Sequence, residues 1–266
     1  MSTAAARSWT RFTAAERAAR YAVYVAIIAA VVASARTVEV IPEFLYDAPE
    51  QVQDLLVRMW PIAFYHYRGG VHDALVETLH IASLGTLLAV LMALPIGVAA
   101  AGNVVRNKAV NYFAKLLLVS SRSVNSLVWA LLFVAVFGPG ALAGTLAIAF
   151  RSIGFVGKLI GEALEETSRG PVEALEAAGS PWGSILAKGY WPQVEPAFWS
   201  VALFRWDINV RESAVLGLVG AGGIGMALDT AINLFQWDRV AMVLFAIFCV
   251  VVLTEVAVTQ IRKRLL

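Results

Sequence analysis

Cysteine, histidine and charge are all scarce in this chain of 266 residues. The single cysteine, Cys249, lies inside an apolar block, which excludes a disulfide framework and a thiol metal cluster. Charged residues make up 15% of the chain and the formal net charge is +2, so no broad basic surface indicates a nucleic-acid partner. The three histidines are His66, His72 and His80. They show no metal-ligand spacing, so we predict no metal site.

Sequence motifs of familiar enzyme classes are also missing. The phosphate-binding pattern G-x-x-x-x-G-K-[ST] does not occur, so we do not expect this chain to hydrolyse ATP. Neither H-E-x-x-H nor G-x-S-x-G occurs, and the acids within the apolar blocks form no evident catalytic pair. We predict no catalytic residue and no cofactor bound by this chain. An intramembrane enzyme and a membrane scaffold are kept as alternatives to the function that the motifs below indicate.

Long apolar blocks are the main feature that is present. Hydrophobic residues make up 59% of the chain and fall in extended blocks rather than in short alternating runs. Such blocks are typical of an integral membrane protein. We predict an all-α membrane fold with six transmembrane helices, at about 21–35, 74–101, a third ending near Phe137, 141–161, 196–218 and 240–261.

The first 73 residues divide into three predicted parts. Residues 1–20 carry four arginines and indicate a cytoplasmic tail: Arg7, Arg11, Arg17 and Arg20. The block 21–35 is near the lower length limit for crossing a bilayer and ends in Ala33-Ser34-Ala35, so it resembles either a signal peptide or, as we favour, an uncleaved anchor. Residues 36–73 indicate an external loop, in which the stretch 49–65 is suited to an amphipathic helix on the membrane surface.

The distribution of lysine and arginine predicts the orientation. Segments that lie inside when both termini are cytoplasmic hold 13 of the 21 cations, whereas the two sizeable outer segments hold 4. The loop before the third span contributes Arg106, Lys108 and Lys115 to the inner side. This asymmetry follows the positive-inside rule. It places the segment 162–193 and the tail 262–266 in the cytoplasm of a cell-membrane protein.

The segment 162–193 contains a short, well-delimited helix. Pro171 suits a first helical position, and Gly179 suits the left-handed position that follows a last turn. The residues between them are strong helix formers. Two turns are too short to be stable alone in water, so we expect this helix to pack on another element and to be presented to a partner.

The same segment resembles the EAA loop of ABC importer permeases, whose pattern is EAA-x3-G-x9-I-x-L-P. Glu173, Ala174, Gly179 and Pro192 match in spacing. Three positions depart from the expected Ala, Ile and Leu: Leu175, Gly189 and Trp191. The resemblance implies a coupling helix that docks into a groove on a separate ATPase subunit, with contact residues Glu173, Ala174, Glu176, Ala177, Ala178, Gly179 and Pro192. The alternative is an ordinary helical connector.

Two further stretches narrow the resemblance, which covers the chain from about residue 73 onward. The run 211–232 resembles the end of span five in phosphonate and methionine importer permeases, and the run 122–134 resembles their R-S-x-P span start, with Asn125 in place of proline. The run G-P-V-E-A-L at 170–175 is similar to the phosphonate group in particular.

This resemblance implies the type I importer permease fold, a domain over 74–261, and uptake of phosphonate or a related phosphorus oxyanion such as phosphite or phosphate. A methionine-type amino acid is the alternative solute. Implied partners are a second copy of the chain, ATPase subunits that hold ATP and Mg, and an external solute-binding protein. The implied mechanism is alternating access.

A glycine cluster follows the fifth predicted span. Gly220, Gly222 and Gly225 spell G-x-G-x-x-G, but a dinucleotide site needs a soluble strand before it and an acid about twenty residues on. A membrane span precedes this cluster instead. We therefore favour close helix packing for these glycines together with Gly223, with the mouth of a solute pathway as the alternative.

Four arginines fall within predicted spans, where charge is costly: Arg122, Arg151, Arg205 and Arg211. One explanation is local neutralisation, Arg205 by Asp207 and Arg211 by Glu212. The other is that unpaired arginines face a water-filled path for an anion, whose oxygens match the guanidinium fork. Arg211 and Arg122 are the better candidates for that second role.

Overall fold

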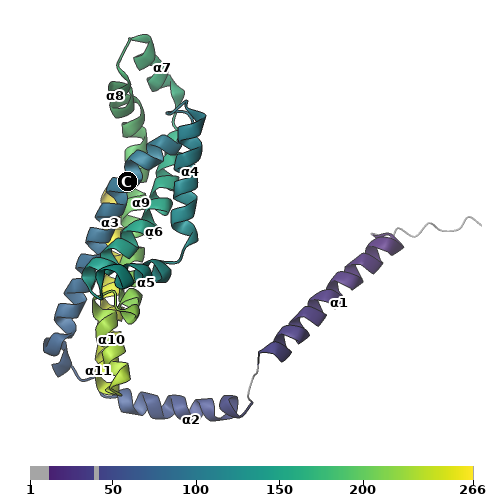
Figure 1. Cartoon of the computed structure of the whole chain (residues 1–266), viewed down its shortest axis with the longest axis vertical. Coiled ribbons are helices and arrows are strands. Elements are labelled where there is room, and N and C mark those ends of the chain that lie inside the picture. Colours follow the sequence, from purple (N-terminus) through teal and green to yellow (C-terminus); the bar gives the residue numbers. More distant parts are fainter. Residues whose placement is uncertain (1–11, 39–41, 266) are drawn as a thin grey trace, which may run out of the picture. The chain divides into compact units, whose positions relative to one another are not determined.

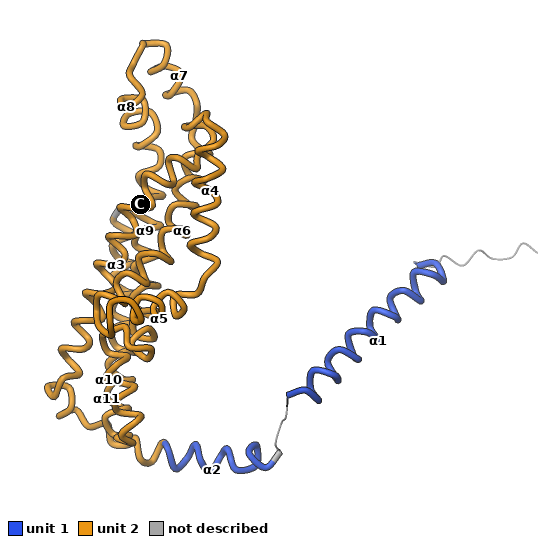
Figure 2. The backbone as a smooth tube through the Cα atoms, viewed as in Figure 1, with its two compact units in different colours: residues 1–55 blue, residues 56–266 orange. Residues whose placement is uncertain are grey.

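The structure, a computed structural model, describes residues 12–38 and 42–265. Within those ranges the chain forms helices and no strand, which confirms the all-α prediction. Contacts divide the chain into two compact units, residues 1–55 and 56–266 (Figure 2). Arg7 and Arg11 of the predicted tail lie outside the described residues.

The first helix, α1 (Ala14–Thr37), begins seven residues before the predicted first span. The reason is a capping box that the apolar pattern does not reveal: Glu16 N donates to Thr13 Oγ1 at 3.4 Å, and Thr13 N donates to Glu16 Oε2 at 2.8 Å. Arg17 and Arg20 therefore belong to the helix and not to a tail.

A second helix, α2 (Pro42–Met59), lies where the external loop was predicted. It begins and ends earlier than the predicted 49–65, because Pro49 is accommodated within it and the chain leaves the helix before Trp60-Pro61. Apolar side chains recur along it at helical spacing, at Phe44, Leu45, Val52, Leu55 and Leu56. An amphipathic helix on the membrane surface stays a prediction for this segment.

Unit 2 is built around two long helices, α3 (His72–Ala100) and α6 (Ala141–Glu165) (Figure 1). Glycines let their backbones approach closely: a Cβ built on Gly97 would lie 2.8 Å from the carbonyl oxygen of Gly157. The helices α9 (Trp191–Leu216) and α11 (Trp237–Leu265) complete the bundle. Buried apolar residues of α3, α4, α6 and α9 form its largest core cluster.

The third predicted span is divided into two helices. It consists of α4 (Lys108–Ser123) and α5 (Ser126–Phe137), which meet at an angle of 89°. Asn125 makes the corner, since its side chain accepts a hydrogen bond from Leu127 N at 3.1 Å and so begins α5. Lys108 and Lys115, which the sequence placed in a loop, lie within α4.

Two short helical regions mark opposite ends of unit 2 (Figure 1). At one end α7 (Arg169–Ala177) and α8 (Trp182–Ile185) connect α6 to α9, the latter through a π-helical turn, Leu186–Tyr190. At the other end α10 (Ile224–Asn233) occupies what was predicted to be a loop. The fifth predicted span, 196–218, is part of a longer helical run, because helical turns extend from Trp182 to Val219.

Four described helices are long and apolar enough to cross a membrane: α1, α3 with its preceding turn, α6 and α11. Two bent pairs pass the same criteria when each is taken together, α4 with α5 and the run Trp182–Val219 with α10, the second bent by 40°. When each bent pair counts as one crossing, the total is the six that the sequence predicts.

Candidate functional site

The helix α7 ends as its sequence predicts. Gly179 has a φ of +70°, its N–H donates to Glu176 O at 3.0 Å, and Ser180 N donates to Leu175 O at 3.0 Å. These two bonds form a Schellman motif, which needs a residue in the left-handed conformation. The start differs: Pro171 is the third helical residue, still in the first turn, where backbone N–H groups have no helical partner.

One face of α7 packs on the chain and the other is exposed. Val172 is buried and Leu175 is half-buried against Gly189, whose built Cβ would lie 3.3 Å from each of their side chains. The residues predicted to contact a partner are all exposed: Glu173, Ala174, Glu176, Ala177, Ala178, Gly179 and Pro192. The helix therefore presents two carboxylates and several small side chains to the outside.

The two ends of the segment that connects α6 to α9 are joined by one side chain, Gln193, which the sequence did not reveal. Gln193 accepts a hydrogen bond from Ser168 N at 2.9 Å and donates to Ser168 O at 3.3 Å and to Gly189 O at 2.7 Å. Two of these bonds connect Ser168, the residue before α7, to the first turn of α9.

A buried polar network joins three helices in the middle of unit 2. Asn209 donates to Thr86 Oγ1 at 2.8 Å and accepts from Ser152 Oγ at 3.2 Å, and Arg205 Nε donates to Ser152 Oγ at 2.8 Å. Arg205, Asn209, Ser152 and Thr86 are all buried. The network fixes the mutual positions of α3, α6 and α9.

Two arginines share a single carboxylate next to this network. Arg205 Nη2 lies 3.3 Å from Glu212 Oε2, and Arg151 Nε lies 3.5 Å from Glu212 Oε1. The three side chains carry a formal net charge of +1. Arg151 Nε is buried and has no hydrogen-bond partner among the described residues. We call these three residues the Glu212 cluster.

The predicted local ion pairs are wrong in their partners. Arg211 pairs with Asp207, four residues earlier, and lies 3.8 Å from Glu255, whereas Arg205 pairs with Glu212. Side chains one or two residues apart point to different sides of a helix, while those four or seven apart share a face. Arg211 thus faces two carboxylates and carries no surplus positive charge.

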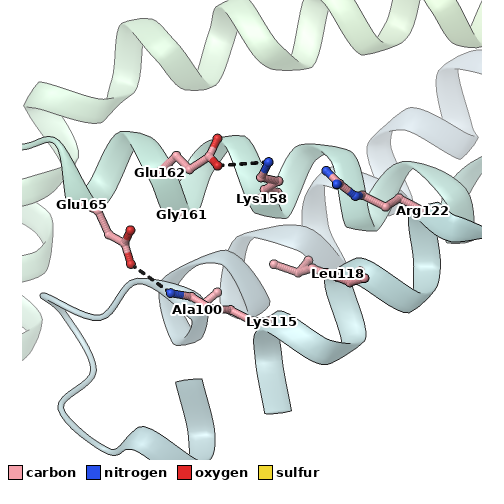
Figure 3. A pocket seen from close by; sticks show the side chains of 9 residues that line it. Ala100, Lys115, Leu118, Arg122, Lys158, Gly161, Glu162 and Glu165 are labelled. Atoms are coloured by element: carbon pink, nitrogen blue, oxygen red, sulfur yellow. Dashed lines mark hydrogen bonds and ion pairs between the residues drawn. The ribbon is translucent and has the colours of Figure 1, made fainter. Parts of the chain in front are cut away.

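Arg122, in the last turn of α4, lies in a pocket between α4 and the second half of α6 (Figure 3). The cavity has a volume of about 360 Å³ and is lined by Ala100, Lys115, Leu118, Val119, Arg122, Lys158, Gly161, Glu162 and Glu165. We call it the α4–α6 pocket. Its lysines and carboxylates are paired, Lys115 with Glu165 at 3.3 Å and Lys158 with Glu162 at 3.2 Å.

Three glycines of the cluster lie close to neighbouring elements. A Cβ built on Gly222 would lie 2.8 Å from Ala141 N, one on Gly223 would lie 2.5 Å from Thr78 Oγ1, and one on Gly225 would overlap the carbonyl oxygen of Ala214. Gly220 has a φ of +84° and its carbonyl accepts from Gly140 N at 2.9 Å. These contacts do not test a role in a solute pathway.

Two histidines lie in the polar contacts near α10. His66 Nε2 lies 2.9 Å from Asp238 Oδ2, which also accepts from Tyr65 Oη at 3.0 Å, and this hydrogen bond raises the pKa of Tyr65. His72 Nδ1 lies 2.9 Å from Tyr67 Oη. Among the described residues, no group of three His, Cys, Asp or Glu side chains is arranged to hold a metal ion.

Five polar residues of these sites were not identified from the sequence: Asn209, Ser152, Lys158, Glu162 and Glu165. The spacing of Arg205, Asn209 and Glu212, at intervals of four and three residues, would have shown one polar face on α9. Lys158, Glu162 and Glu165 show the same signal on α6. Ser152 and Lys115 carry no such signal, because their partners lie on other helices.

Comparison with known proteins identifies relatives over most of the chain. A family model described as "Binding-protein-dependent transport system inner membrane component" matches residues 93–266. The phosphite transport system permease protein PtxC of Stutzerimonas stutzeri is 39% identical over 203 residues, which is 76% of this chain and 74% of that protein. The phosphate-import permease protein PhnE of Mycolicibacterium smegmatis is 36% identical over 237 residues, 89% of this chain but only 44% of that longer protein.

A solved structure has the same fold. A chain of the MetNI methionine ABC transporter in an inward-facing conformation matches with a TM-score of 0.66, at 21% identity, over 74% of this chain and 96% of its own length. At this level of identity the match establishes the fold alone. It confirms the prediction of a type I importer permease fold.

Proposed function

The chain belongs to the family of binding-protein-dependent transport system inner membrane components, and on that premise we propose that it takes up a phosphorus oxyanion as the permease subunit of an ATP-driven ABC importer. It is a transporter subunit and not an enzyme, since its relatives are permeases. Phosphonate and phosphite are the solutes we favour, followed by phosphate.

The observation that carries this proposal is the construction of α7. Its exposed face offers Glu173 and Glu176 among small residues, and its end is fixed by Gly179. A small-residue surface lets a partner approach closely, and the clamp made by Gln193 passes the partner's movement to α9. These are the properties required of a helix that docks into a groove on an ATPase subunit.

We place α7 and both termini in the cytoplasm. Support comes from the asymmetry of lysine and arginine along the chain and from Arg262, Lys263 and Arg264 in the last turn of α11. With this orientation α10 faces outward, where an external solute-binding protein would deliver the ligand. The protein is then a multi-pass component of the cell membrane.

The assembly we propose contains a second copy of this chain and separate ATPase subunits, which bind ATP and Mg. Six crossings are half of the pathway expected for this fold. When ATP closes the ATPase subunits, the two α7 helices move together and α9 of each copy moves with them. The pathway then opens outward by alternating access.

The Glu212 cluster supports an anionic solute. Arg151 and Arg205 share one carboxylate, so one positive charge remains available within the span. We propose that Arg151 and Arg122 contact the solute, while buried Arg205 holds Glu212 in place and Arg211 is occupied by its own carboxylates. The glycine loop at residues 220–225 then packs at the outer mouth of this path.

A methionine-type solute is the alternative, and solute-dependent ATP hydrolysis distinguishes the two. The complex of this chain with its ATPase subunit and binding protein is placed in lipid, and ATPase activity is measured with phosphonate, phosphite, phosphate and methionine. We expect stimulation by the oxyanions alone. Stimulation by methionine would replace the solute but keep the importer, and failure to associate with any ATPase subunit would refute the role of α7.

The role of α7 itself is tested by Gly179→Val. A valine at a φ of +70° is strained by roughly 1–3 kcal/mol, so the end of α7 should shift and ATP hydrolysis should no longer drive uptake. Gly183→Val is the matched control, because Gly183 has open space around it and no positive φ. Normal solute-stimulated turnover in Gly179→Val would count against the assignment.

A further inference from the structure

The α4–α6 pocket contains one cation that its ion pairs do not neutralise. Lys115, Arg122 and Lys158 line it together with Glu162 and Glu165. Each carboxylate is engaged by one lysine. In the part of the chain that the structure describes, Arg122 makes no ion pair, so the pocket keeps a formal charge of +1 at its guanidinium.

Arg122 lies far from the α7 end of α6. Its Cβ lies 3.0 Å from a Cβ built on Gly154, which is eleven residues before the end of α6 at Glu165. At 1.5 Å per residue this corresponds to about 16 Å along the helix. Arg122 is exposed, and an arginine within a span is costly in hydrocarbon unless it faces water or an anion. The cavity between α4 and α6 supplies that space (Figure 3).

The pocket continues a row of positive charge that begins at the Glu212 cluster. Arg151 lies three residues before Gly154 and Lys158 four residues after it, so all three share one face of α6. Arg151 and Lys158 are thus about 10 Å apart along the helix, with Arg122 between them. An anion that leaves Arg151 toward the α7 end of unit 2 meets Arg122 next.

We propose that Arg122 and Lys158 form an exit site for the phosphorus oxyanion on the α7 side of the bundle. This inference rests on the proposed function, which supplies the anionic solute and the direction of transport. The guanidinium of Arg122 donates two hydrogen bonds to the anion, and Lys158 turns from Glu162 to the same ligand. Glu162 and Glu165 repel the bound anion, which keeps its affinity low and favours release.

The ligand chemistry is a phosphoryl or phosphonyl oxygen, which a phospholipid headgroup could also provide. The test uses the complete importer in liposomes of phosphatidylcholine, with and without phosphatidylglycerol. The initial rate of uptake of phosphite from the binding-protein side is measured while phosphite on the ATPase side is increased. An exit site on the ATPase side predicts that this added phosphite inhibits uptake.

We expect Arg122→Gln to raise the inhibitory phosphite concentration about tenfold, because a charge-assisted contact to the anion is lost. Arg122→Lys should retain part of the inhibition. Arg106→Gln is the matched control, since Arg106 is exposed in the loop between α3 and α4 and outside the pocket. Protein insertion and basal ATPase activity identify any variant that fails to fold.

Equal inhibition of the wild type and Arg122→Gln overturns the exit site while leaving the importer intact. A defect in Arg122→Gln that depends on phosphatidylglycerol, with no inhibition by phosphite in either lipid, assigns the pocket to a lipid headgroup and also overturns it. If the wild type takes up no phosphorus oxyanion at all, the proposed function itself has failed.

Discussion

The contact between Leu175 and Gly189 yields a prediction that can be worked through quantitatively. Both positions depart from the importer pattern, which has alanine at the first and isoleucine at the second. In the structure the larger residue of α7 fills the space above the smaller residue of the π-helical turn. We infer that the two departures compensate each other. The single variants Leu175→Ala and Gly189→Ile should each loosen α7, and the double variant should restore it.

The size of each effect follows from the packing. Leu175→Ala removes three carbons from a half-buried side chain, which costs about 1 kcal/mol. A Cβ on Gly189 already lies 3.3 Å from Leu175 Cδ1 and Val172 Cγ2, so the three further carbons of isoleucine overpack the contact by about 1–3 kcal/mol. In the double variant the new isoleucine occupies the space that Leu175 leaves, and we expect a coupling energy of at least about 1 kcal/mol.

Hydrogen exchange of the amides of α7, in the assembled complex in lipid, measures this local stability. A loss of 1 kcal/mol speeds exchange from the open state about fivefold. Each single variant should exchange faster than the wild type and the double variant should approach it, with coupled uptake following the same order. Gly189→Ala controls for the helix propensity gained by replacing glycine. Additive effects of the two substitutions would refute the compensation.

Two further predictions concern the buried network and the corner between α4 and α5. Glu212→Gln leaves buried Arg205 without a counter-charge and should cost about 3–5 kcal/mol, measured as loss of folded protein in detergent. Glu255→Gln removes one partner of an exposed pair and should cost under about 1 kcal/mol. Similar losses in the two variants would contradict the pairing of Arg205 with Glu212. Asn125→Pro and Asn125→Leu both remove the cap, which should cost about 1 kcal/mol. Proline recovers about 0.4–1 kcal/mol, because it fits the φ of −67° and restricts the unfolded chain, so Asn125→Pro should keep a Tm close to that of the wild type and Asn125→Leu should lower it. An unchanged Tm for Asn125→Leu would argue against capping.

The sequence predicted those features that depend on nearby residues. The end of α7 follows from Gly179, and the apolar blocks locate the main helices. The corner at Asn125 was missed because apolar residues continue on both sides of it, so hydropathy contains no break. The start of α1 was missed because the arginines of its first turns obscured the capping box at Thr13.

The sites were harder to predict, because their partners come from distant segments. Lys115 and Glu165 are 50 residues apart in the chain, and Arg205 meets Ser152 across 53 residues. Periodicity along α9 could have paired Arg205 with Glu212. It could not have shown that Arg151 of α6 shares the same carboxylate, since that requires the packing of two helices.

The right-angled corner between α4 and α5 limits how much of a bilayer this pair of helices can cross. The 16 residues of α4 extend about 24 Å, less than the roughly 30 Å of hydrocarbon in a bilayer. Because α5 turns through 89°, it adds width to this crossing rather than depth. The pair α4–α5 therefore reaches less deeply into a bilayer than its two helices would if they were collinear.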